Sequence, residues 1–185
     1  VAGWNMQALK AGRMAGCTHP QLKNAIKKSI NFCKLAYGGK GGFGYASSPG
    51  DRGNMGGVGT VAMQLLGASS DKRVREGCER IGGIRLKAYE EVMADPTKWS
   101  SVGSKNLYGW YYDTQAIFNS QNLDKARWKS WRKAFESVLI RAQHDEGYWE
   151  TTGHGTGANT PGRVLSTCWS ALQLEVYYRY LPTFC

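Results

Sequence analysis

The feature that most constrains the fold of this chain is an internal repeat of about 54 residues. Four short apolar segments align without gaps and share an alanine at the same place: Ala8, Ala62, Ala116 and Ala171. These alanines are 54, 54 and 55 residues apart. Nearly equal spacings indicate a repeat architecture in which each unit packs against its neighbours. We therefore divide the chain into repeats of about 1–54, 55–108, 109–162 and 163–185.

Each repeat is predicted to contain two helices of different character. The first is apolar nearly all round, as in residues 59–66 and 166–178, so it must be surrounded by protein. The second is amphipathic, with apolar residues at steps of three and four. In the second repeat Gly82 and Gly83 interrupt this pattern. In the third repeat the apolar residues are Trp128, Trp131, Phe135, Val138, Leu139 and Ala142.

Alternating inner and outer helices predict an all-α fold, either an α/α toroid or an α-solenoid. Common helical solenoids repeat every ~33–47 residues, so a period of about 54 residues favours the toroid. The chain holds only about three and a half helical hairpins, which we interpret as an incomplete ring. We expect residues 1–185 to be a single α/α-toroid domain, the C-terminal part of a longer one, or a self-associating chain.

A spaced motif follows the third outer helix. It runs Lys133-Ala134, Val138-Leu139, Gln143 and Gly147-Tyr148-Trp149. This order resembles the QW repeat of squalene-hopene and oxidosqualene cyclases, with Val138 in the place of an aromatic residue. Residues 166–172 resemble the inner helices of protein prenyltransferase β subunits. The chain therefore resembles the terpenoid cyclase and protein prenyltransferase superfamily of α/α toroids, which includes the prenyltransferase and squalene oxidase repeat proteins.

The motif is expected to be structural rather than catalytic. We expect Gln143 to hydrogen-bond backbone groups left open at a helix end, and Gly147 to permit a tight chain reversal. The ring of Trp149 would pack under the next hairpin. A decayed copy in the first repeat places Gly42 and Phe43 at the corresponding positions. The motif thus ties neighbouring hairpins together.

The resemblance also identifies a candidate catalytic residue. Cyclases of this family protonate an alkene with an Asp-x-Asp-Asp sequence followed by Thr. Residues 110–114 match only its end, at Asp113 and Thr114. Tyr112 stands in the place of the protonating Asp, and a phenol with a pKa near ~10 is a poor acid for this step. Asp113 is therefore the candidate, with a structural acid of an inner helix as the alternative.

No metal site or cofactor is predicted. Ser166 occupies the place of the inner-helix His that binds zinc in protein prenyltransferases. His144, His154 and Cys168 lie in one region of the chain, but their spacing matches no standard zinc pattern. A further alternative is a carbohydrate-active toroid enzyme, whose acids and stacking aromatic rings would be Asp113, Glu146, Glu150, Tyr108, Trp110, Tyr148 and Trp149.

We expect a binding domain without the standard catalytic acid rather than an enzyme. Its ligand would be a hydrophobic, isoprenoid-like molecule or a protein partner, held in an aromatic-lined cavity between inner helices. The alternatives are an active isoprenoid cyclase or transferase that uses Asp113, and the carbohydrate-active enzyme. The residues predicted to line the cavity are Trp110, Tyr112, Gln115 and Trp169.

Charge and cysteine content add little to this hypothesis. The net charge is +10, and residues 1–50 hold seven Lys and Arg residues and no acid. A nucleic-acid partner is not favoured, because no recognition module accompanies the charge. No apolar run approaches the ~18 residues of a membrane-spanning helix. The five cysteines form no paired spacing, which favours a reducing, cytoplasmic compartment but leaves the location open.

Overall fold

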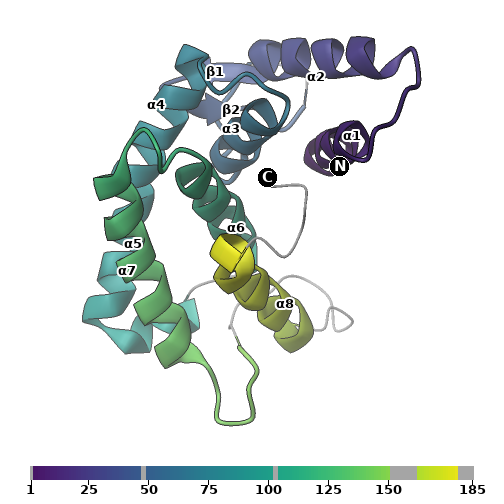
Figure 1. The fold of residues 1–185 in the computed structure, drawn as a ribbon. Coiled ribbons are helices and arrows are strands. Elements are labelled where there is room, and N and C mark those ends of the chain that lie inside the picture. The colour runs from purple at the N-terminus through teal and green to yellow at the C-terminus, as the bar shows by residue number, and fades with distance from the viewer. Residues whose placement is uncertain (1, 47–48, 102–103, 151–161, 179–185) are drawn as a thin grey trace.

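The computed structural model of the chain describes residues 2–46, 49–101, 104–150 and 162–178. Most of these residues are helical, which confirms the predicted all-α character. The helices form two rows that alternate along the chain (Figure 1). The inner row contains α1 (Ala2–Met14), α3 (Met55–Leu65), α6 (Ser104–Asn119) and α8 (Gly162–Glu175). The outer row contains α2 (Leu22–Ala36), α4 (Lys72–Arg80), α5 (Leu86–Ala94) and α7 (Lys125–Ala142).

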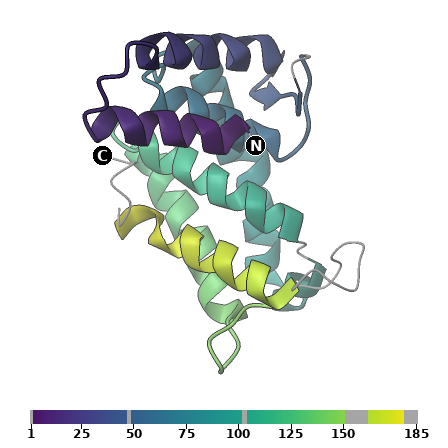
Figure 2. The same cartoon turned by 90° about the vertical axis from the view of Figure 1, so that its right-hand side faces the viewer.

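Neighbouring helices of the inner row contact one another in chain order: α1 with α3, α3 with α6, and α6 with α8. The outer helices pack on this row, with α2 against α1 and α3, α4 against α3, and α7 against α6. The two rows curve together, with the outer helices on the convex side (Figure 1). Figure 2 shows α1, α6 and α8 one below another with similar axis directions. One inner and one outer helix thus make up the first and third periods of the sequence, whereas the second period contains α3 followed by two outer helices, α4 and α5.

The glycine pair of the second outer helix forms a π-helical turn, η1 (Ile81–Arg85), between α4 and α5. A Cβ atom on Gly82 would lie 2.8 Å from Cδ of Arg127 on α7, so glycine permits this close approach of two outer helices. Nothing lies within 4 Å of the corresponding position on Gly83. The turn ends at Arg85, whose side chain reaches the inner helix α6 at Asp113.

A short antiparallel hairpin follows α2 and is formed by β1 (Tyr37–Gly39) and β2 (Gly42–Phe43). Lys40 at its tip has a φ of 47°, and Gly41 has a φ of 75°. A Cβ atom on Gly41 would lie 2.6 Å from the carbonyl oxygen of Glu76 on α4. The hairpin therefore needs glycine at this position to pack against the next outer helix. Two 3-10 helices complete the described elements, η2 (Pro96–Ser101) and η3 (Val176–Tyr178).

The core lies between the two rows and contains a buried polar network. Oγ1 of Thr114 on α6 accepts hydrogen bonds from Nε1 of Trp131 on α7 and from Nε2 of Gln173 on α8, both at 2.9 Å. The same Gln173 amide donates to the hydroxyl of Tyr89 on α5. All four residues are fully buried. Because unpaired polar groups are costly in a core, this network fixes how the four helices pack.

Candidate functional site

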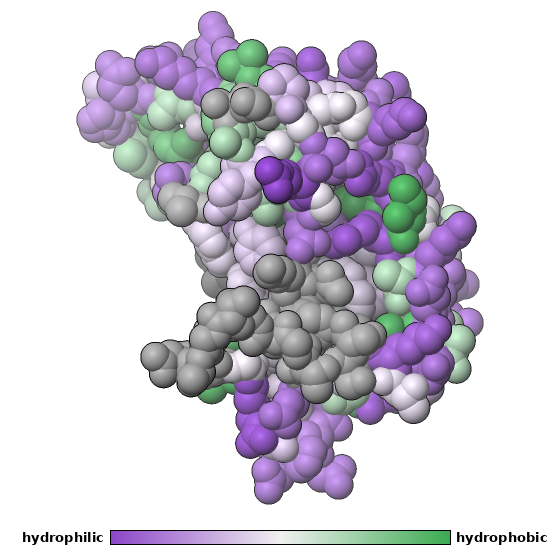
Figure 3. Space-filling view, turned by 180° about the vertical axis from the view of Figure 1, so that it is seen from behind, coloured by the Kyte–Doolittle hydropathy of each residue, from purple (hydrophilic) through white to green (hydrophobic). Residues whose placement is uncertain are grey.

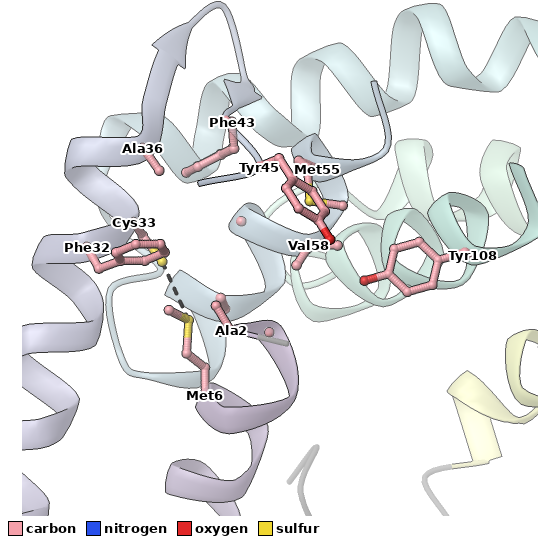
Figure 4. A pocket seen from close by; sticks show the side chains of 14 residues that line it. Ala2, Met6, Phe32, Cys33, Ala36, Phe43, Tyr45, Met55, Val58 and Tyr108 are labelled. Atoms are coloured by element: carbon pink, nitrogen blue, oxygen red, sulfur yellow. Dashed lines mark hydrogen bonds between the residues drawn. The ribbon is translucent and has the colours of Figure 1, made fainter. Parts of the chain in front are cut away.

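An apolar cavity of about 360 Å³ lies between α1, α2 and α3, at the first end of the two rows (Figure 4). Among the residues that the structure describes, no charged side chain lines it. Its two tyrosines, Tyr45 and Tyr108, point their hydroxyl groups toward each other beside Val58 (Figure 4). The Tyr45 side chain is 78% exposed, so this end of the cavity opens to solvent. The apolar lining consists of Ala2, Met6, Phe32, Cys33, Ala36, Phe43, Met55, Val58 and Ala62.

Small residues of three helices create this cavity. Gly3 on α1 lies so close to α3 that a Cβ atom would be 2.9 Å from Cγ1 of Val58. Gly59 on α3 lies under the ring of Phe43, and a Cβ atom on Gly59 would lie 2.4 Å from Cγ of Phe43. On the α2 side Sγ of Cys33 lies 3.6 Å from Sδ of Met6. Burial raises the pKa of the Cys33 thiol to about 11, so the thiol remains protonated and contributes only apolar surface.

A cluster of five aromatic rings adjoins the cavity on the inner row. The rings belong to α1, α6 and α8, and the closest centroids lie 5.0 to 6.5 Å apart. Tyr108 belongs both to this cluster and to the cavity lining. Nε2 of Gln7 donates to the hydroxyl of Tyr112 at 3.4 Å. The aromatic cluster comprises Trp4, Tyr108, Tyr111, Tyr112 and Trp169.

The structure places two of the four predicted cavity residues, Tyr112 and Trp169, in the aromatic cluster. Trp110 lies on the other face of α6, between the two rows, where its ring centroid is 3.8 Å from that of Tyr89. Gln115 is buried next to Tyr111. Burial raises the pKa of Tyr111 to about 12, and the Gln115 side chain partly opposes this rise. None of the four predicted residues lines the cavity itself.

Asp113, the candidate catalytic residue, is buried and ion-paired. Its Oδ2 accepts a hydrogen bond from Nε of Arg85 at 2.8 Å, and Nη2 of Arg85 also donates to Oδ1 of Asn54 at 2.9 Å. Its Oδ1 faces Gly57 on α3. Burial raises the pKa of Asp113 to about 6, and the Arg85 guanidinium partly opposes this rise. Asp113 does not line the cavity, so this carboxyl group and the apolar site are separate.

The motif residues of the third repeat connect α7 to α8. Nε1 of Trp149 donates to the carbonyl oxygen of Leu139, in the last turn of α7, at 2.8 Å. The backbone N–H of Trp149 donates to Oγ1 of Thr167 on α8 at 3.0 Å. Nε2 of Gln143 donates to the carbonyl oxygen of Gly147 at 2.9 Å, and Gly147 has a φ of 87°. The Trp149 indole therefore hydrogen-bonds to the C-terminal end of α7, whereas Gln143 stabilises the turn at Gly147.

The first repeat makes a corresponding connection with different residues. Phe43 is buried and packs on Gly59 of the next inner helix, α3. Its ring lies edge-on to Tyr37 at the end of α2, with centroids 5.2 Å apart. Gly42 lies so close to α4 that a Cβ atom would be 3.0 Å from Nη1 of Arg80. As in the third repeat, an aromatic residue after the outer helix contacts the next inner helix.

The described residues contain no group of three or more His, Cys, Asp or Glu side chains that could hold a metal ion. His144 accepts a hydrogen bond from the backbone N–H of Glu146, and His154 lies outside the described residues. Of the proposed carbohydrate-site acids, Glu150 is paired with Arg163 at 3.3 Å. No helix in the described part of the chain is long and apolar enough to cross a membrane.

The sequence pattern did not reveal the cavity, but three of the five rings of the aromatic cluster, Tyr108, Tyr112 and Trp169, were candidate site residues. Trp4 and Tyr111 were not singled out, although helical periodicity carried a signal for the latter. Tyr108, Tyr111 and Tyr112 are three and four residues apart and so share one face of α6, whereas Trp110 does not. No comparable signal marks the cavity, because its lining comes from α1, α2, α3, α6 and the segment 43–45, which lie far apart in the sequence.

Comparisons of the chain with models of known families, with curated proteins and with solved structures found no match.

Proposed function

We propose that this chain is an arc of an α/α toroid that binds a hydrophobic, isoprenoid-like molecule between α1, α2 and α3. The observation that carries the proposal is the 360 Å³ cavity, whose described lining residues are all uncharged. Its size is at the lower end of the ~300–1,000 Å³ of ligand sites, which suits a single slender chain. Burying such a chain contributes ~25 cal/mol for each Å² of apolar surface removed from water.

Three observations support the toroid part of the proposal. The inner helices contact one another in chain order, and the outer helices pack on their convex side. In the first and third repeats the sequence period matches one inner and one outer helix. In two repeats an aromatic residue, Phe43 or Trp149, connects an outer helix to the next inner helix. These links are the ones that the resemblance to QW repeats implies.

Ligand binding is favoured over alkene protonation because of where Asp113 lies. An acid that protonates an alkene must be neutral and must face the substrate. The Asp113 carboxyl group instead faces Arg85 and Gly57, and it is absent from the cavity lining. None of the described residues that line the cavity carries a carboxyl group. We therefore propose a binding domain.

Titration with farnesol, followed by tryptophan fluorescence and calorimetry, tests the proposal. Val58→Phe fills the cavity, while Val164→Phe adds the same atoms on α8, where the Val164 side chain is 59% exposed. We expect wild type and Val164→Phe to bind alike and Val58→Phe to bind at least tenfold more weakly. Thermal unfolding verifies that both variants are folded. Equal binding by the two variants, or no binding by wild type, would overturn the proposal.

A further inference from the structure

Four rings of the aromatic cluster form a closed circuit across three inner helices. The successive centroid distances are 6.4 Å from Trp4 to Tyr112, 5.0 Å to Tyr108, 5.2 Å to Trp169 and 6.5 Å back to Trp4. Three of the four neighbouring pairs are crossed at 59° to 89°, and the fourth at 32°. A square circuit with sides of this size has its centre roughly 4 Å from every centroid, inside the ~6 Å range of cation–π attraction.

The electrostatics of this circuit suit a cation. Burial raises the pKa of Tyr108, Tyr111 and Tyr112, so all three phenols stay neutral and keep their electron-rich faces. The negative field of Glu175 reaches Tyr111 and raises its pKa further. Within the described residues, no Lys or Arg side chain lies over any ring of the aromatic cluster. In the described part of the chain, the circuit therefore offers several aromatic faces and no cation of its own.

The circuit is joined to the apolar cavity. Tyr108 belongs to both, with its hydroxyl group pointing toward Val58 and the cavity (Figure 4). Gly3 lines the cavity, and Trp4 follows it directly in α1. A Cβ atom on Gly3 would lie 3.9 Å from the Tyr112 hydroxyl oxygen. An apolar chain in the cavity can thus carry a head group that lies among the rings.

We propose that the ligand is a single-chain amphiphile with a quaternary ammonium head, held by Trp4, Tyr108, Tyr112 and Trp169 while its apolar tail fills the cavity. This inference rests on the proposed function of the cavity. An anionic head is disfavoured, because no Lys or Arg is found among the described residues that line the cavity. A primary ammonium head carries three N–H donors, and the only oxygen acceptors on the four rings are the hydroxyl groups of Tyr108 and Tyr112, the latter already bonded to Gln7. A quaternary ammonium has no N–H group, so it is the cation that aromatic faces recognise best.

Calorimetric titration with three probes of equal chain length tests the inference: decyltrimethylammonium and decyl sulfate, each below its micelle concentration, and decanol below its solubility limit. We expect decyltrimethylammonium to bind at least tenfold more tightly than decanol, which corresponds to ~1.4 kcal/mol. Decyl sulfate should bind most weakly. Equal binding of the cation and the alcohol, or tighter binding of the sulfate, would overturn the inference and leave the proposed function standing. If no probe binds, both fail.

Substitutions locate the head group. Trp4 is 47% exposed, so Trp4→Leu should fold normally, and Trp169→Leu removes a second ring of the circuit. Both should abolish the preference for the cation but leave decanol binding within about twofold of wild type. The matched control is Trp99→Leu, which removes a tryptophan of η2 outside the aromatic cluster and should keep the preference. An unchanged preference in Trp4→Leu and Trp169→Leu would overturn the inference.

Discussion

The buried ion pair between Asp113 and Arg85 predicts a specific pH dependence of stability. Asp113 is only 1% exposed, and its partner Arg85 reaches it from η1 at 2.8 Å. Burial favours the neutral carboxyl group and the guanidinium favours the charged one, and burial is the larger effect. The pKa therefore rises from 3.8 to about 6 on folding. Asp113→Asn removes this titration without changing the size of the side chain.

The sign and size of the effect follow from proton linkage. A carboxyl group with the higher pKa in the folded chain binds protons more readily when folded, so it adds stability at acid pH. That stability is lost as the pH rises from 3.8 to about 6. One pKa unit corresponds to ~1.36 kcal/mol, so the loss is about 3 kcal/mol. Asp113→Asn does not undergo this loss. The free energy of unfolding of Asp113→Asn minus that of wild type should therefore rise by this amount between acid and neutral pH.

Urea unfolding followed by tryptophan fluorescence, at a series of pH values from acid to neutral, measures this difference. Other carboxyl groups titrate equally in both proteins and cancel in the comparison. The control is Asp145→Asn, which removes an exposed carboxylate. Its free energy of unfolding should change with pH in the same way as that of wild type. If wild type and Asp113→Asn also run parallel, the reasoning is refuted. The attraction of Arg85 would then balance the cost of burial.

Three further predictions concern the contacts between the rows, and urea unfolding measures each. Gly59→Ala should destabilise by about 1–3 kcal/mol, because its methyl group would lie 2.4 Å from the Phe43 ring, whereas Gly83→Ala has open space and should not destabilise. Trp149→Phe should cost about 1 kcal/mol by losing one hydrogen bond to a helix end. Thr114→Val should cost about 2–3 kcal/mol, since two buried donors lose their acceptor. A result near zero for any of the three destabilising variants would contradict its contact.

The repeat in the sequence predicted the alternation of helices because periodicity reflects packing. The four aligned alanines all lie on inner helices, at Ala8, Ala62, Ala116 and Ala171. Ala62 and Ala116 are buried, while Ala8 is exposed and Ala171 is half-buried. The difference has a physical reason, since α1 and α8 each have an inner neighbour on one side only. The alignment gives the place of a residue in its repeat, but burial depends on the place of the repeat in the row.

Finer features depended on loop geometry and could not be predicted. Both Gln143 and Trp149 carry an N–H donor that could bind an open carbonyl group at a helix end. The motif predicted this role for Gln143, but Trp149 reaches Leu139 because Gly147 adopts a positive φ. The reversal of the chain at Gly147 then leaves Gln143 closer to the turn than to the helix. Spacing in a motif does not determine which donor takes which carbonyl group.

The charge of the chain and the chemistry of the site lead to one consequence for ligand binding. The lysines of α2 that face solvent, Lys23, Lys27 and Lys28, lie outside the cavity lining. In the view of Figure 3, hydrophilic residues cover most of the surface. The net charge of +10 repels any cation at long range, and salt screens this repulsion. A quaternary ammonium probe should therefore bind more tightly as salt is added, after correction with decanol for salting-out. An anion held by the lysines of α2 would bind more weakly as salt is added. The salt dependence therefore distinguishes binding at the aromatic cluster from binding at α2.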